Sequence, residues 1–295
     1  MTSFNKGILY IIIGSFWWGV IGVIYFRSLS FVGSIELVLH RVFWTAVMLI
    51  ITTIYLSKWG EIKKIFINKK SFFYLTISSF LIFINWSVWI YAVSTNQIVD
   101  ASFGYFIMPI LSVLFGYLFF KEILNKLRIF SVILTIISVV YLFYFYKNFP
   151  WVGLTVGFSW SLYNVFRKKI NVDVDLGLLV ESLLILPFAI IGFYFVFKSG
   201  NMDFGMSSIK LSIILTLAGP MTVIPLFFFV KGVYLSGLGP SGMLFFITPT
   251  FQFILGLFLY NEPFDFYRLI GFILIWVAVI IYIFDLYENN YIIFN

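Results

Sequence analysis

Ten apolar runs separated by short polar turns constrain what this chain of 295 residues can fold into. The runs span about 7–26, 34–56, 72–93, 99–120, 127–146, 150–168, 176–197, 209–230, 239–260 and 267–286. A helix needs roughly 20 apolar residues to cross the hydrocarbon core of a bilayer. Because lipid offers no hydrogen bonds to the backbone, spanning segments of this length are helical. The sequence therefore predicts an all-α integral membrane protein with ten transmembrane helices.

The composition fits a chain that is solvated by lipid. Hydrophobic residues make up 62% of the chain and charged residues 11%, whereas a soluble domain carries about 25% charged residues. The net charge of +7 is spread over short turns, so we expect a lipid bilayer and no nucleic acid as the partner. With no cysteine and one histidine, most metal and catalytic-triad chemistry is excluded. We therefore expect neither an enzyme nor a cofactor.

Lysine and arginine are distributed unevenly between alternate turns. One set of turns holds thirteen of them, from Lys6 to Lys231, and the other set holds five. Cytoplasmic turns carry the excess of basic residues, so ten spans place both termini in the cytoplasm. The segment Met1–Lys6 and the first run are not expected to be a cleaved signal peptide, because the later runs repeat the pattern and no Ala-x-Ala site follows.

A stretch in the middle of the chain recurs 140 residues later, in Val99–Arg128 and Gly239–Arg268. The offset aligns Pro109 with Pro249, Gly116 with Gly256, Glu122 with Glu262 and Arg128 with Arg268. We predict two five-helix repeats, 1–147 and 148–295, and an odd number of spans per repeat inverts the second one. Inverted repeats are typical of transporters that work by alternating access. Pro109 and Pro249 are predicted to bend their spans and to leave the carbonyls of Tyr105 and Phe245 free.

Charged residues in the second and seventh spans are candidates for coupling or gating. Glu36 and His40 share one helix face, and Arg41 lies beside them. They either form a proton-sensing pair and part of the solute cavity, or serve structure, with Glu36 capping its helix and Arg41 reaching the headgroups. Glu181, 140 residues after Arg41, is either a gate residue or a carboxylate that reaches the membrane surface.

Aromatic and amide side chains on several spans suggest a shared cavity. An unpaired amide near mid-membrane is costly, so such residues are expected to face one another or a solute. Together with His40 and Arg41, the predicted lining consists of Trp18, Asn85, Trp89, Tyr105, Trp160, Asn164 and Gln252.

The motifs occur in an order that resembles a known family. They are ELVLHRVFW at 36–44, NWSVW at 85–89, ASFGYFIMP at 101–109, FSWSLYNVFRKK at 158–169, AGPMTVIPL at 218–226 and FFITPTFQFILG at 245–256. The chain resembles the EamA-type transporters of the drug/metabolite transporter superfamily, in particular their RarD-like branch. Ser161 and Asn164 stand where that pattern is expected to have glycines.

The resemblance implies ten helices in two inverted repeats, a bacterial inner-membrane location and a central cavity that opens to either side in turn. We therefore predict a secondary transporter for a small organic solute, such as a metabolite, an amino-acid-like compound or an amphipathic drug-like compound. A non-transporting membrane scaffold or a lipid-modifying protein is the alternative. The sequence leaves open a homodimer, the substrate, the direction of transport and the coupling ion.

Overall fold

The computed structural model describes residues 2–95, 98–145, 151–259 and 266–293, and these residues form helices joined by short turns. The first half contains α1 (Ser3–Phe16), the π-helical turn η1 (Trp17–Gly22), α2 (Val23–Ser28), α3 (Ser34–Tyr55), α4 (Trp59–Ile67), α5 (Lys69–Ser94), α6 (Ile98–Phe120) and α7 (Lys126–Phe145). The second half contains α8 (Trp151–Lys168), α9 (Val174–Lys198), α10 (Ile209–Thr216), α11 (Ala218–Ser236), α12 (Leu238–Leu244), α13 (Ile247–Phe258) and α14 (Phe266–Ile293).

The prediction of an all-α membrane protein is confirmed. Eight helical segments of the described chain are long and apolar enough to cross a membrane. The other two predicted spans are α6, whose described apolar stretch is the shorter Ile107–Phe120, and α8, which carries polar residues such as Asn164 and Arg167. The count of ten spans therefore stays a prediction. The short helix α4 is the basic amphipathic segment between the second and third spans.

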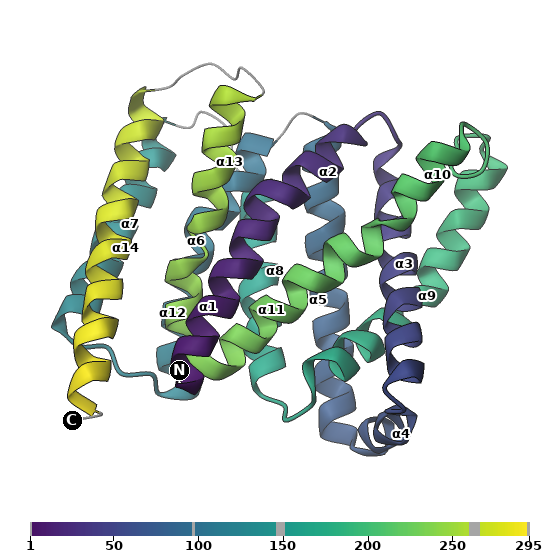
Figure 1. Ribbon diagram of the computed structural model, residues 1–295. Helices are drawn as coiled ribbons and strands as arrows, with labels where there is room; N and C mark the ends of the chain where they lie inside the picture. The colour runs from purple at the N-terminus through teal and green to yellow at the C-terminus, as the bar shows by residue number, and fades with distance from the viewer. Residues whose placement is uncertain (1, 96–97, 146–150, 260–265, 294–295) are drawn as a thin grey trace.

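Helices of the two halves occupy matching positions in the chain. The starts of α9, α10, α12 and α14 lie 140 residues after the starts of α3, α5, α6 and α7. The matching helices also pack against each other as the pairs α3–α9, α6–α12 and α7–α14. Figure 1 shows α7 with α14 at one edge and α3 with α9 at the opposite edge. Both termini lie at the same end of the molecule (Figure 1).

The outer helices present large apolar side chains to their surroundings. Ile137 and Val140 on α7, Phe195 on α9 and Ile280 on α14 are all more than half exposed. Apolar surface of this extent is stable only when lipid or another apolar partner covers it. These faces therefore contact the lipid bilayer.

The two repeated prolines lie in different local structures. Pro109 is buried inside the continuous helix α6, whereas the ninth predicted span breaks at Phe245–Phe246, between α12 and α13. The predicted interruption is present there, but the Phe245 carbonyl is not free, because it accepts a hydrogen bond from Thr248 N at 2.9 Å. Pro249 then lies in the first turn of α13, where the missing N–H of proline costs no helical hydrogen bond.

Candidate functional site

A cavity lies where the first span changes from α1 to α2 through the π-helical turn η1. A π-turn adds a residue to a helical turn and often marks a functional position. Here it brings Trp18 and Gly22 to the cavity, while Gly19 packs closely on α13, because a Cβ at Gly19 would lie 3.1 Å from the Thr248 carbonyl oxygen. No feature of the sequence predicted this turn.

The cavity has an empty volume of about 470 Å³, which includes space open to the outside, and it is lined mainly by aromatic side chains. Its lining residues are Trp18, Gly22, Phe26, Arg41, Asn85, Trp86, Trp89, Tyr105, Trp160 and Phe245. They come from both halves of the chain. Phe26 on α2 and Arg41 in the first half of α3 place the cavity toward the end of the molecule opposite the termini (Figure 1). We call it the Arg41 cavity.

Arg41 is buried, at 5% exposure, and does not reach the membrane surface. Its Nε donates to Thr222 Oγ1 at 3.0 Å. Its guanidinium lies 4.6 Å from the ring centre of Trp86, with Phe26 at 5.2 Å and Trp89 at 5.9 Å. Cation–π contacts of this kind offset part of the cost of a charge away from water. The aromatic rings therefore hold a positive charge at the wall of the cavity.

Amide and hydroxyl groups connect the helices around the Arg41 cavity. Asn85 Nδ2 donates to the Val156 carbonyl at 2.9 Å and to Ser159 Oγ at 3.1 Å, which ties α5 to α8. The Tyr105 hydroxyl forms hydrogen bonds with the side chains of Trp89 and Gln252. Gln252 thus contacts the cavity through Tyr105.

A layer of aromatic side chains closes one end of the Arg41 cavity. Trp18 and Trp160 meet edge to face with ring centres 5.0 Å apart, and both contact Phe229 and Phe245 at 5.5–6.2 Å. We call these four side chains the aromatic layer. The indole N–H groups of Trp18, Trp86 and Trp160 are buried and have no hydrogen-bond acceptor in the described part of the chain. Three lining residues therefore carry buried donors whose hydrogen-bonding capacity the described residues leave unused.

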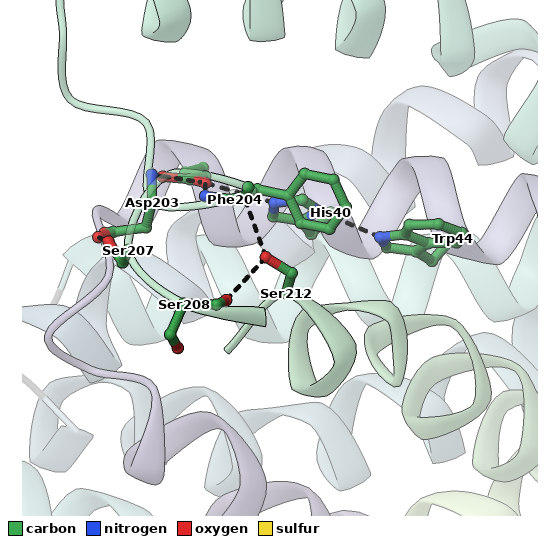
Figure 2. A network of polar contacts seen from close by, with 9 residues as sticks. His40, Trp44, Asp203, Phe204, Ser207, Ser208 and Ser212 are labelled. Carbon is green, nitrogen blue, oxygen red and sulfur yellow. Dashed lines mark hydrogen bonds and ion pairs between the residues drawn. The ribbon is translucent and has the colours of Figure 1, made fainter. Parts of the chain in front are cut away.

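His40 lies outside the Arg41 cavity, in a separate network that Figure 2 shows. Trp44 Nε1 donates to His40 Nδ1 at 3.1 Å, and His40 Nε2 lies 3.4 Å from Glu36 Oε1. Because the indole only donates, Nδ1 is an acceptor and the imidazole proton lies on Nε2, toward Glu36. The His40 ring packs against Phe193 and Phe204, with ring centres 4.9 and 4.8 Å away, and not against the lining of the Arg41 cavity.

Glu36 anchors the loop between α9 and α10. Its carboxylate accepts hydrogen bonds from the backbone N–H groups of Asp203, at 2.9 and 3.1 Å, and Phe204, at 2.9 Å. Figure 2 shows this loop lying over the start of α3, with Phe204 against His40. Glu36 thus makes a structural contact. Its carboxylate binds backbone N–H groups of the α9–α10 loop and not those at the start of its own helix, α3.

Glu181 is buried in the other half of the molecule. It accepts hydrogen bonds from Ser78 Oγ at 2.5 Å and Tyr163 Oη at 3.3 Å, and its Oε1 lies 3.5 Å from Arg167 Nε. It is therefore held inside the bundle and does not reach the membrane surface. Arg41 donates instead to Thr222 Oγ1.

Asn164, another residue predicted to line the cavity, lies one helical turn beyond Trp160 and lines a second cavity. Four further lining residues were not predicted from the sequence: Gly22, Phe26, Trp86 and Phe245. Trp86 belongs to the NWSVW motif and directly follows Asn85. It was not predicted because it lies on a different helix face from Asn85 and Trp89. The other three depend on the π-turn and on the helix break at Phe245–Phe246.

Glu122 joins three helices at the end of the molecule that holds the termini. Its carboxylate accepts hydrogen bonds from Lys168 Nζ at 2.6 Å and from the backbone N–H groups of Leu238 and Gly239 at 2.7 and 2.9 Å. A Cβ at Gly116 would lie 2.6 Å from Glu122 Oε2. The repeated Gly-x5-Glu spacing therefore makes room for this carboxylate. We call this set of bonds the Glu122 contact; Glu262, its counterpart in the second repeat, lies outside the described residues.

Comparison with known proteins agrees with this geometry. The family model described as "EamA-like transporter family" matches residues 5–144 and again residues 150–284. The chain belongs to the EamA-like transporter family. "Protein RarD" of Salmonella typhi is 31% identical to this EamA-like protein, with 95% of each chain covered.

Two further relatives are described as transporters. "Uncharacterized transporter" of Vibrio cholerae is 33% identical over 95% of this chain and 93% of that protein. "Uncharacterized transporter YojE" of Bacillus subtilis is 32% identical over 95% and 94%. A solved crystal structure has the same fold, with a TM-score of 0.67 and 12% sequence identity over 95% of this chain and 94% of that one. The EamA-like protein is thus a RarD-like membrane transporter.

Proposed function

We propose that the protein is a secondary transporter that moves a small amphipathic organic solute by alternating access. The observation that supports this most is the Arg41 cavity, which combines aromatic walls with a guanidinium and three indole N–H groups that have no acceptor among the described residues. Such a lining suits a solute with an apolar body and one or more acceptor oxygens, such as a carbonyl or carboxylate. We assign no catalytic step to the chain.

Alternating access is supported by the relation between the two halves, 1–147 and 148–295. The family model matches each half once, and matching helices start at a constant offset of 140 residues. In an inverted repeat, exchange of the conformations of the two halves moves the opening from one side to the other. The Glu122 contact joins the turn after α6 to α8 and α12, at the end opposite the Arg41 cavity. We therefore propose that this contact keeps the path from that end to the Arg41 cavity closed while the cavity is open at the other end.

The orientation follows from the basic residues. We propose that the protein lies in the bacterial inner membrane with both termini in the cytoplasm, because basic residues concentrate in the turns on that side. A homodimer stays a prediction. Single cysteines in place of Lys126 and Asp265 should react with an impermeant reagent from opposite sides of the membrane. Labelling of both from the same side would contradict the inverted arrangement.

The function is tested by comparing metabolites inside and outside cells with and without the protein. We expect one or a few amphipathic solutes to change their distribution, and Trp89→Ala to abolish the change. Trp59→Ala is the matched control, because Trp59 lies on α4 and outside the cavity. If no solute responds to the wild-type protein, or if both variants behave alike, the proposed function is wrong.

A further inference from the structure

A second cavity lies beyond the aromatic layer, at the end of the molecule that holds the termini. Its empty volume is about 610 Å³, which includes space open to the outside, and it is formed by the end of α8, the turn that follows it, the start of α9 and the end of α11. Asn164, which lines it, follows Trp160 by one turn of α8, so the aromatic layer separates the two cavities. We call it the Arg167 cavity.

Arg167 is buried, with a side chain only 2% exposed. Its Nη2 donates to the Val174 carbonyl at 3.2 Å, and its Nε lies within ion-pair distance of Glu181 but makes no hydrogen bond. Nε and Nη1 have no acceptor among the described residues. A Cβ at Gly177 would lie 1.8 Å from Nη1, so only glycine leaves room for the guanidinium here. The site is therefore built around this arginine.

The charges that line the Arg167 cavity do not balance. Arg167, Lys168 and Lys231 are cationic, and Asp173 is the one carboxylate in the lining. Lys168 is paired with Glu122, and Asp173 is paired with Lys58, which lies outside the lining. In the described part of the chain no carboxylate lies within ion-pair distance of Lys231. Arg167 lies within ion-pair distance of Glu181, so Lys231 is the one cation of the lining without a carboxylate partner among the described residues.

Asn164 adds an acceptor to these donors. Its Nδ2 donates to the Trp160 carbonyl at 2.9 Å, while its buried Oδ1 receives no hydrogen bond from the described residues. Buried polar atoms normally have partners. A ligand that satisfies the site carries an anionic group for Arg167 and Lys231, and a hydroxyl donor for Asn164.

We propose that the Arg167 cavity is a second binding site, specific for a small organic anion with a hydroxyl group beside its carboxylate. The carboxylate would lie between Arg167 and Lys231, and the hydroxyl would donate to Asn164 Oδ1. This goes beyond the proposed function, which places the transported solute in the Arg41 cavity. The site is accessible from the end of the molecule that holds the termini, where the Arg41 cavity is closed by the aromatic layer.

The electrostatic part is tested with a cysteine in place of Val172, a lining residue, in the purified protein, which has no native cysteine. An anionic methanethiosulfonate should react faster than a cationic one of similar size. Lys231→Gln should lower the ratio of the two rates about fivefold, as expected for one unit charge at roughly 8 Å in aqueous dielectric, and Arg167→Gln should also lower it. Lys210→Gln, at an exposed position outside the cavity, is the matched control and should leave the ratio unchanged.

Ligand specificity is tested by protection of the same cysteine at constant ionic strength. Glycolate should slow the reaction more than acetate or phosphate, and neutral glycolamide should not slow it. Three results would overturn the proposal. The cysteine could react at equal rates in glycolate and chloride, phosphate could protect it as strongly as glycolate, or the ratio of the two reagent rates could be equal in Lys231→Gln and Lys210→Gln. If Arg167→Gln does not fold, Lys231→Gln carries the test. The measurement requires no flux, so its failure leaves the proposed transport function standing.

Discussion

Replacement of Glu122 by glutamine should open the end of the molecule that holds the termini. The Glu122 carboxylate accepts hydrogen bonds from Lys168 at 2.6 Å and from two backbone N–H groups at 2.7 and 2.9 Å. Glutamine keeps the shape but loses the charge, and its NH₂ group opposes at least one of these donors. A hydrogen bond to a charged group contributes about 1.5–3 kcal/mol.

The magnitude follows from the exposure of the carboxylate. Because the Glu122 side chain is 19% exposed, solvent screens part of the interaction, and we take a loss of about 2 kcal/mol from the low end of that range. If the contact exists only in the conformation described here, the equilibrium between conformations shifts by the same amount, roughly 30-fold.

The assay uses the reactivity of a cysteine in place of Val233, which is 3% exposed and lines the Arg167 cavity. Glu122→Gln should raise its rate of reaction with a maleimide by at least tenfold, while a cysteine in place of Phe26 in the Arg41 cavity reacts more slowly. Glu61→Gln on the exposed α4 helix is the matched control. A lower melting temperature with unchanged rates at both cysteines would refute the reasoning, because the contact would then stabilise the fold without controlling access.

Three further predictions concern contacts elsewhere in the protein. Glu36→Ala removes the acceptor of three loop hydrogen bonds, so limited proteolysis should cleave the α9–α10 loop faster; unchanged cleavage would contradict the anchoring role. The hydrogen bond with Asp175 raises the pKa of Lys58, so this pair stabilises the fold fully below the unfolded-state pKa and loses its effect as pH rises through the folded-state pKa. The melting-temperature difference between wild type and Lys58→Gln should therefore be constant from about pH 6 to pH 9 and shrink above about pH 10.5; a difference that grows with alkaline pH would exclude this pairing. Gly219→Ala places a Cβ 2.5 Å from the Trp44 carbonyl oxygen, and overpacking of this kind should cost about 1–3 kcal/mol in the free energy of unfolding measured with denaturant; a neutral effect would show that α3 and α11 can separate.

The sequence was sufficient to predict helices and most of the cavity because both depend on local periodicity. Asn85 and Trp89 lie four residues apart on one helix face, and the structure places both in the Arg41 cavity. The repeat around Pro109 could also be recognised in the sequence, but the contacts that its residues make could not be predicted from it. The glycine at 116 is explained only by the Glu122 carboxylate that lies against it, a contact that depends on how the following turn folds back.

The remaining site residues depend on contacts that no single helix reveals. His40 and Arg41 were both predicted to line the cavity, but contacts with Glu36, Trp44 and Phe204 hold His40 in a separate network. The aromatic rings of Phe26, Trp86 and Trp89 surround Arg41. Phe245 lies in the lining where α12 ends. The position of Phe245 results from the helix break between α12 and α13. Pro249 suggested a break in this span, but the sequence did not show which side chain the break would direct into the cavity.

Flux through reconstituted protein tests the central claim that the Arg41 cavity carries the transported solute. Proteoliposomes would be loaded with the solute found by metabolite comparison, and its exit would be followed for wild type, Trp89→Ala and Trp59→Ala. We predict that wild type and Trp59→Ala release the solute at equal rates and that Trp89→Ala releases it no faster than protein-free liposomes. Release by Trp89→Ala at the wild-type rate would contradict the account.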